Sequence, residues 1–368
     1  MSGRFESNTT QDPASRRGRR RRGNLADAAS FNIHDALNVR TNVPIVPKLP
    51  EHFRVASVNP DLEVVSVPEL TRPPEDSVRS TIGHPGTCDL GGGEVYYECP
   101  APFLQYLSEK AAWRFLVRGL GDRETRITTA FPRFSVGPIG SRLRDLLSRI
   151  VYVAITMKLA RKGVALCHAS AVAKGDDACV IFGYGGTGKT TLTAALMRSV
   201  CDGYLSDDYS LVDKQGRVYC WPEYYPPHTE VSGSPGLRYV LGQYRSTREA
   251  PFPIRKRATV NTILFLERGP DGVEELDADG SARRLVLLNM EELWRLWNSP
   301  VSQILGQYSY FYPSLDLAEI LREYTALTAS FASRAPHAFV VRSRGASFRN
   351  AQDLLAQVLG GRRDEARP

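Results

Sequence analysis

Several features that define other classes of protein are missing from this chain. No apolar run approaches the ~18 residues that a helix needs to cross a bilayer, and no apolar stretch typical of a secretory signal peptide is present near the N-terminus. The six cysteines form no C-x-x-C pair, which argues against a zinc site or a disulfide framework. We therefore expect a cytoplasmic protein with reduced, buried thiols and no membrane span.

Motifs of three common enzyme or switch classes are also absent. The chain has no N-K-x-D segment for guanine recognition, no G-x-S-x-G nucleophile turn and no H-E-x-x-H zinc helix. A switch GTPase, a serine hydrolase of that type and a zinc protease are therefore unsupported.

Positive charge is concentrated at one end of the chain. Of the net charge of +7, residues 1–24 carry +5, because this segment contains seven arginines and only two acidic residues, Glu6 and Asp12. Residues 1–30 are polar and aperiodic, so they are predicted to form a disordered tail. The run Arg16–Arg22 could bind nucleic acid, an acidic peptide or an anionic surface. No aromatic residues interleave with these arginines, which favours a solvated tail without a fixed partner.

The next part of the chain has the pattern of a small β-rich module at residues 31–138. Its first residues, 31–50, contain three prolines and are predicted to be an extended lead-in. Alternating or apolar segments then predict strands, at residues 53–58, 62–67, 95–98, 113–117 and 124–129.

Residues 139–362 are predicted to form the second and larger domain. Leucine and isoleucine three or four apart predict a helix over 140–162, ended by Gly163. A strand over 164–172 carries His168 and turns at Lys174–Asp177 into the apolar strand 178–182. Further strands are expected at 203–212, 217–221, 259–266 and 338–341. Helices are expected at 191–197 and 350–359, and residues 290–333 are expected to be mainly helical with an aromatic break at Tyr308–Pro313.

The most informative segment follows the apolar strand 178–182. Gly183–Thr190 fits G-x-x-x-x-G-K-[ST], in which backbone N–H groups and a helix N-terminus hold phosphate oxygens. Strand, loop and helix occur in the order that this phosphate-binding loop (P-loop) requires. Lys189 is expected at the β- and γ-phosphates, and Thr190 at Mg²⁺. The expected nucleotide-binding residues are Gly183, Gly185, Gly186, Thr187, Gly188, Lys189, Thr190 and Thr191.

Two carboxylates predicted at the end of a strand shortly downstream could complete a phosphoryl-transfer site. One of Asp207 and Asp208 could bind Mg²⁺ and the other accept a proton from an attacking hydroxyl, and spacing does not assign the roles. His168 could be a metal ligand, a proton relay, a phosphate contact or a satisfied core residue. The cluster Arg255–Arg257 could supply positive charge or be a solvated strand start. His228 and Glu230 could face substrate.

Three blocks of the sequence resemble the C-terminal domain of HPr kinase/phosphorylase. They are Leu166–Val172, Gly183–Thr191 and Leu205–Asp208. The same blocks are similar to ATP-type phosphoenolpyruvate carboxykinase, and the layout before the P-loop resembles HPr-kinase-like proteins of lasso-peptide clusters. The resemblance implies an α/β fold with a mixed sheet, and an ATP- and Mg²⁺-dependent kinase that phosphorylates a hydroxyl, usually of serine.

The resemblance also assigns roles to individual residues. Lys189 and Thr190 match the phosphate and metal contacts, and the acid pair matches the family's base and metal contact. We take Asp207 with Thr190 as the metal ligands. His168 matches the histidine near the transferred phosphoryl group. The implied catalytic set is His168, Lys189, Asp207 and Asp208.

Two functions remain open from the sequence. The first is a kinase for a hydroxyl on a peptide, protein or small molecule. The second is a nucleotide-binding regulatory protein with little transfer activity, tethered by its basic tail. The loop 222–250 and the N-terminal module are the expected selectivity elements for the acceptor, and the family likeness suggests homo-oligomers.

Overall fold

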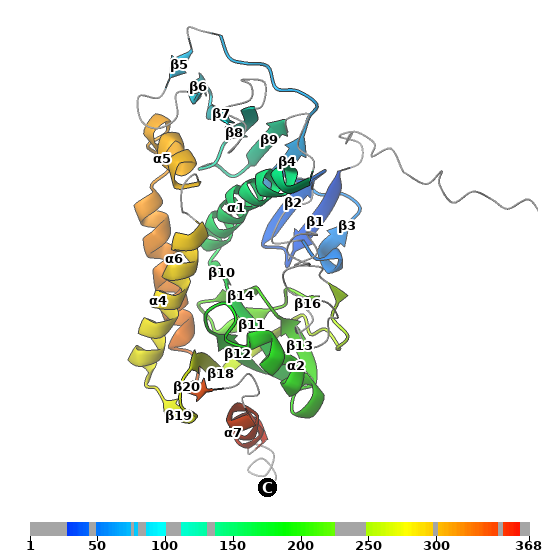
Figure 1. Cartoon of the computed structure of the whole chain (residues 1–368), viewed down its shortest axis with the longest axis vertical. Helices are drawn as coiled ribbons and strands as arrows, with labels where there is room; N and C mark the ends of the chain where they lie inside the picture. Colours follow the sequence, from blue (N-terminus) through cyan, green and yellow to red (C-terminus); the bar gives the residue numbers. More distant parts are fainter. Residues whose placement is uncertain are drawn as a thin grey trace, which may run out of the picture.

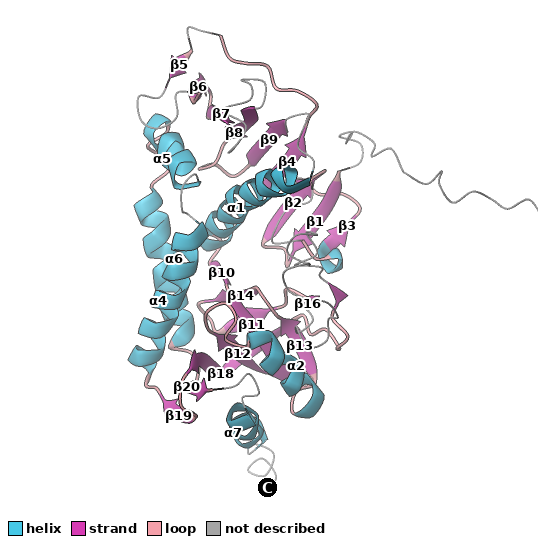
Figure 2. Ribbon diagram, in the orientation of Figure 1, coloured by secondary structure: helices cyan, strands magenta, loops and turns pink. Residues whose placement is uncertain are grey.

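The computed structural model places the chain in two β-sheets joined by helices. It describes residues 28–43, 49–74, 77–79, 86–100, 112–130, 137–224, 248–296, 301–344 and 349–360. Figure 1 shows one sheet toward each end of the molecule, with helix α1 (Gly137–Arg161) running between them. Figure 2 shows helices and strands throughout, and both large sheets combine parallel and antiparallel pairs. The protein is therefore a mixed α/β structure.

The N-terminal sheet contains nine strands, all from the first 130 residues of the chain. In spatial order they are β3 (Arg54–Val55), β1 (Ala29–Ile33), β2 (Leu37–Thr41), β4 (Leu62–Ser66), β9 (Thr125–Ala130), β8 (Ala112–Arg118), β7 (Glu94–Pro100), β6 (Cys88–Gly91) and β5 (Val78–Arg79). Strands β2, β4 and β9 run parallel to one another. A short 3₁₀ helix, η3 (Glu51–Phe53), leads into β3.

The C-terminal sheet holds the P-loop strand near its centre. Seven strands follow the order β10 (Val164–Cys167), β14 (Ser210–Asp213), β15 (Arg217–Tyr219), β18 (Arg257–Arg268), β12 (Asp177–Phe182), β11 (Ala169–Lys174) and β13 (Gly203–Ser206). Strand β20 (His337–Ser343) also pairs with β18, and β19 (Gly272–Glu275) pairs with β20. Strands β12, β18 and β20 are parallel, so their carboxyl ends meet at one edge. A separate pair joins β16 (Glu223–Tyr224) to β17 (Arg248–Glu249).

Helices cover both faces of the C-terminal sheet. One side is packed by α2 (Lys189–Ser199) and α7 (Arg349–Gly360), and the other by α1, α4 (Ala278–Leu296) and α6 (Leu317–Ala332). Helix α5 (Val301–Phe311) instead contacts the N-terminal sheet, where Tyr97 donates a hydrogen bond to the Ile304 carbonyl at 3.0 Å.

The P-loop strand β12 shows why its sequence is apolar throughout. Ala178, Val180 and Phe182 pack into the cluster under α1 and α6, whereas Cys179 and Ile181 pack into the cluster under α2 and α7. Successive side chains of a strand point to opposite faces. A strand covered by helices on both faces therefore needs apolar residues at every position.

Helix α1 links the two sheets. It begins with Gly137-Pro138, and proline fits the first turn of a helix because it lacks only an N–H that has no helical partner there. It ends before Gly163, which takes a left-handed φ of +75°. Along its length α1 packs against β2 and β4 on one side and against β10 and α6 on the other. The predicted helix over 140–162 is therefore confirmed.

Two predicted strands are each divided in the structure. Residues 164–172 form β10 and β11, which separate at His168, and residues 203–212 form β13 and β14, which separate at residues 207–209. The cause is a change of partner, because β10 pairs with β14 whereas β11 pairs with β12 and β13. Three of the predicted catalytic residues, His168, Asp207 and Asp208, lie at these two breaks.

The prediction of an extended lead-in at residues 31–50 is wrong in part. Strands β1 and β2 form a hairpin there, turned at His34 and Asp35 with φ values of 49° and 58°. Helix α4 also begins at Ala278, earlier than the predicted residue 290.

Two predictions about the surroundings of the protein can be placed against the structure. Among the described residues, no helix has the length and apolar character to cross a membrane. The basic run Arg16–Arg22 lies outside the described residues.

Candidate functional site

The loop between β12 and α2 is shaped by two close approaches. A side chain at Gly183 would put its Cβ 2.8 Å from Thr187 Oγ1 and 2.9 Å from the Leu266 carbonyl oxygen, so only glycine fits. Thr187 Oγ1 donates to the Tyr184 carbonyl at 2.8 Å and closes the loop on itself. Gly188 precedes the helix with a left-handed φ of 109°. The loop therefore turns back over the N-terminus of α2, where N–H groups and the helix dipole favour an anion.

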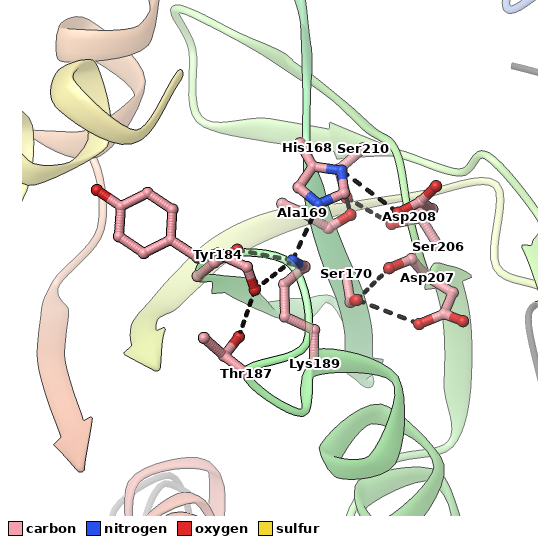
Figure 3. Close-up of polar contacts among 11 residues, drawn as sticks. His168, Ala169, Ser170, Tyr184, Thr187, Lys189, Ser206, Asp207, Asp208 and Ser210 are labelled. Atoms are coloured by element: carbon pink, nitrogen blue, oxygen red, sulfur yellow. Dashed lines mark hydrogen bonds and ion pairs between the residues drawn. The ribbon is translucent and has the colours of Figure 1, made fainter. Parts of the chain in front are cut away.

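The Lys189 side chain folds back over this loop. Its Nζ donates to the Gly183 carbonyl at 2.6 Å and contacts the Tyr184 carbonyl at 3.5 Å. It also lies 3.0 Å from Nε2 of His168 (Figure 3). The residue is only 6% exposed, so its charge is directed into the loop. Thr190 and Thr191 follow in the first turn of α2 and are half-buried.

His168 bridges Lys189 and Asp208. Its Nδ1 lies 3.3 Å from Oδ1 of Asp208, on the opposite side of the ring from Lys189 (Figure 3). Lys189 can only donate, so Nε2 accepts, and the neutral ring then carries its proton on Nδ1 facing the carboxylate. This order fixes the tautomer and places the lone pair of Nε2 against Lys189, beside the loop.

Asp207 belongs to the same site but is held differently from Asp208. The Ser170 hydroxyl donates to the Asp207 backbone carbonyl and lies 3.3 Å from its Oδ1. Nearby, the Ser206 and Ser210 hydroxyls are in contact, and Ser210 donates to the Ala169 carbonyl at 2.9 Å. Asp207 is 1% exposed, whereas the Asp208 side chain is 22% exposed. Of the two carboxylates, Asp208 is therefore the more exposed to solvent.

The structure places a second positive group at the loop, and sequence reasoning missed it. Arg268 ends β18, and its Nη2 donates to the Gly186 carbonyl at 3.0 Å. Only the pairing of strands shows that Arg268 lies near the loop, because β18 runs parallel to β12 with Phe265 opposite Phe182. Residues that follow Phe265 therefore reach the P-loop edge.

The same register moves Arg255–Arg257 away from the site. Thr259 pairs with Asp177, so the start of β18 lies at the end of β12 opposite the P-loop. Arg255 there bonds to Asp176 at 2.8 Å. The interpretation of this cluster as charge for the transferred group is therefore not supported. His228, Glu230 and the loop over residues 225–247 lie outside the described residues.

The oxygen donors of the site can be compared with what Mg²⁺ requires. Among the described residues, no three His, Cys, Asp or Glu side chains gather as a metal site. Mg²⁺ usually binds through one or two carboxylates together with substrate phosphates and water, so a full protein cage is not needed. The carboxylate of Asp207 and the hydroxyl of Thr190 supply the hard donors that this mode uses. By the chemistry of their oxygen atoms, these two residues would suit an Mg²⁺ ion that also binds the phosphates of a nucleotide.

Comparisons with known proteins add no family to this picture. No protein-family model matches the chain, and no curated protein shows significant sequence similarity to it.

Proposed function

We propose that the protein is an ATP-dependent kinase that transfers the γ-phosphoryl group to a hydroxyl of a peptide, protein or small molecule. The resemblance to HPr kinase favours a serine hydroxyl. The observation that carries the proposal is the linked order of Lys189, His168 and Asp208 at the mouth of a P-loop. A phosphate-binding loop needs only its amides and lysine to bind nucleotide. An imidazole oriented by a carboxylate is the additional part that proton transfer requires.

The contacts support a role for each group. The loop amides and Lys189 would hold the triphosphate, with Arg268 placed to add positive charge at the same edge of the sheet. The acceptor oxygen forms a bond to the γ-phosphorus as the bond to the β–γ bridging oxygen breaks, and ADP leaves. When Nζ of Lys189 turns from His168 to the phosphates, Nε2 of His168 becomes free to accept the hydroxyl proton, while its Nδ1–H is held by Asp208. Mg²⁺, bound by Thr190 and Asp207, would neutralise phosphate charge.

The alternative is a nucleotide-binding regulatory protein with little transfer activity. It shares the P-loop with the kinase but gives no role to the His168–Asp208 contact. The two functions differ in whether label leaves ATP for an acceptor.

Incubation of the full chain with γ-labelled ATP, Mg²⁺ and a cell extract tests the proposal. Wild type and Lys174→Ala should label an acceptor, whereas Lys189→Ala should label it about 10²–10³-fold less. Lys174 is a matched control because it lies at the hairpin end of β11, away from the P-loop. Nucleotide binding by the wild type without label on any acceptor would favour the regulatory function, and equal labelling by all three proteins would exclude this site.

A further inference from the structure

A column of aromatic rings connects the N-terminal sheet with His168. We define this ring column as Phe53, Trp221 and Tyr209, three side chains from three separate segments. We propose that Tyr209 is a positioning residue for His168 and that the N-terminal sheet holds it in place through Phe53 and Trp221. The kinetic part of this inference rests on the proposed function, whereas its structural part does not.

At the site end of the column, Tyr209 supports the imidazole from the side. Its ring centroid lies 6.0 Å from that of His168 at an interplanar angle of 70°. Tyr209 directly follows Asp208 in the chain, so one bend supplies both the carboxylate on Nδ1 and the ring beside the imidazole. A displacement of Tyr209 would therefore move both contacts of His168 together.

Tyr209 is itself enclosed by two further rings. Tyr152 of α1 lies 5.4 Å from it, and Trp221 lies 6.4 Å from it. Trp221 is fully buried and Tyr209 nearly so. Rings in such edge-to-face and tilted contacts are held by both packing and quadrupole interactions. Within the C-terminal sheet, the position of Tyr209 thus depends on Trp221.

The other end of the column belongs to the N-terminal sheet. Phe53 of η3 is buried, and its ring lies 5.7 Å from Trp221 at 68°. His34, in the β1–β2 turn, lies 5.0 Å from Phe53 and donates from Nε2 to the Cys220 carbonyl at 2.8 Å. The N-terminal sheet therefore contacts the C-terminal sheet at Trp221 and at the residue before it.

The turn that makes this contact has an unusual backbone. His34 and Asp35 are the non-glycine residues with positive φ among those described. Residues other than glycine adopt a positive φ only at a cost in free energy, so surrounding contacts must maintain this backbone conformation. The hydrogen bond of His34 to Cys220 and its ring contact with Phe53 are two such contacts. We infer that this turn holds Phe53 against Trp221.

The matched variants Phe53→Leu and Phe115→Leu test the inference. Both replace a buried phenylalanine of the N-terminal part, but Phe115 stacks on Tyr97 at 4.7 Å, inside the N-terminal sheet and outside the column. One measurement is the NMR chemical shift of the His168 ring protons at fixed pH, assigned with His168→Asn. The second is a separate determination of kcat and of KM for ATP.

We expect Phe53→Leu to shift the His168 ring signals and to lower kcat about 10-fold or more, with KM for ATP little changed, because small misplacements of reacting groups slow catalysis strongly. Phe115→Leu should lose about as much thermal stability as Phe53→Leu but should leave the His168 ring signals unchanged. Tyr209→Phe, which keeps the ring, should retain the wild-type signals of His168. Identical His168 signals in wild type and Phe53→Leu would overturn the inference. If no acceptor is ever labelled, the proposed kinase function fails. The NMR comparison then still decides whether the N-terminal sheet positions His168.

Discussion

Nζ of Lys189 lies 3.0 Å from Nε2 of His168, so the end of the P-loop and the break between β10 and β11 meet at one point. The contact gives the imidazole an acceptor role on this side and a donor role toward Asp208 on the other. It joins the lysine of the predicted phosphate-binding loop to an imidazole, a group that can move a proton. Each side of this arrangement can be tested separately.

The close packing behind the P-loop predicts different effects at two of its glycines. Gly183→Ala should reduce the free energy of unfolding by about 1–3 kcal/mol, because the new methyl group meets a backbone oxygen of Leu266. Gly185→Ala should leave stability nearly unchanged, because a Cβ there meets no atom within 4 Å. Urea unfolding without nucleotide measures both, and equal losses in the two variants would contradict the described packing.

The parallel register predicts that the two ends of β18 differ in function. Arg268→Ala should weaken ATP binding or transfer about 10–100-fold, the range for losing a hydrogen bond to a charged group. Arg255→Ala should change neither, since this residue lies at the opposite end of the strand. Titration with a fluorescent ATP analogue and a transfer assay provide the comparison. A larger effect for Arg255→Ala would restore the charge role predicted from the sequence.

The His168–Asp208 contact predicts a loss of rate without a loss of nucleotide affinity. In Asp208→Asn the amide no longer favours the proton on Nδ1, so we expect kcat to fall about 10²–10⁴-fold. Asp202→Asn makes the same charge change at the other end of β13 and should retain activity. Steady-state kinetics with ATP binding measured in parallel checks this. Unchanged kcat in Asp208→Asn would remove His168 from proton transfer.

The half-buried side chain of His34, in the β1–β2 turn, predicts a pH dependence of stability. Burial lowers the pKa of His34 below its ordinary value of 6.5, and His52 and Lys256 act in the same direction, against the Cys220 carbonyl and Asp35. The unfolded chain then binds more protons than the folded one just below pH 6.5, so stability falls as pH decreases through this window.

The variant His34→Asn isolates this contribution. Asparagine tolerates positive φ but does not titrate, so the variant should show a weaker decline in stability between about pH 7 and 5. A residual slope should persist, because the pKa of His52 is also lowered by burial. Urea unfolding at a series of pH values makes the comparison. The same slope in wild type and variant would assign the pH dependence to other groups.

The predictions from sequence were most accurate where the signal is local. Helix α1 follows from apolar spacing between Pro138 and Gly163, and the hairpin before the P-loop follows from a polar turn at residues 174–177. The pairing of the strand that follows His168 with the P-loop strand has the same local origin, because a hairpin pairs its own two strands. Local patterns gave no sign that His34 and Asp35 turn the chain within a proline-containing segment.

Other features needed long-range pairing that no local pattern contains. The local pattern of residues 203–212 predicts one strand. In the structure β13 pairs with β11, whereas β14 pairs with β10 and β15, and this change of partner leaves Asp207 and Asp208 at a bend. Arg268 and Arg255 are both basic residues near one strand, and only the parallel register with β12 decides which of them reaches the loop.

The amino-acid sequence was sufficient to predict the loop between β12 and α2, because Gly183–Thr190 contains its glycines and its lysine within eight consecutive residues. The tertiary structure alone decided that His168 contacts Lys189 and Asp208, that Arg268 joins them, and that Phe53 of the N-terminal sheet packs on Trp221 behind Tyr209. The physical reason is that these contacts depend on strand register and on the packing of one sheet against another, which are set by residues far apart in the chain.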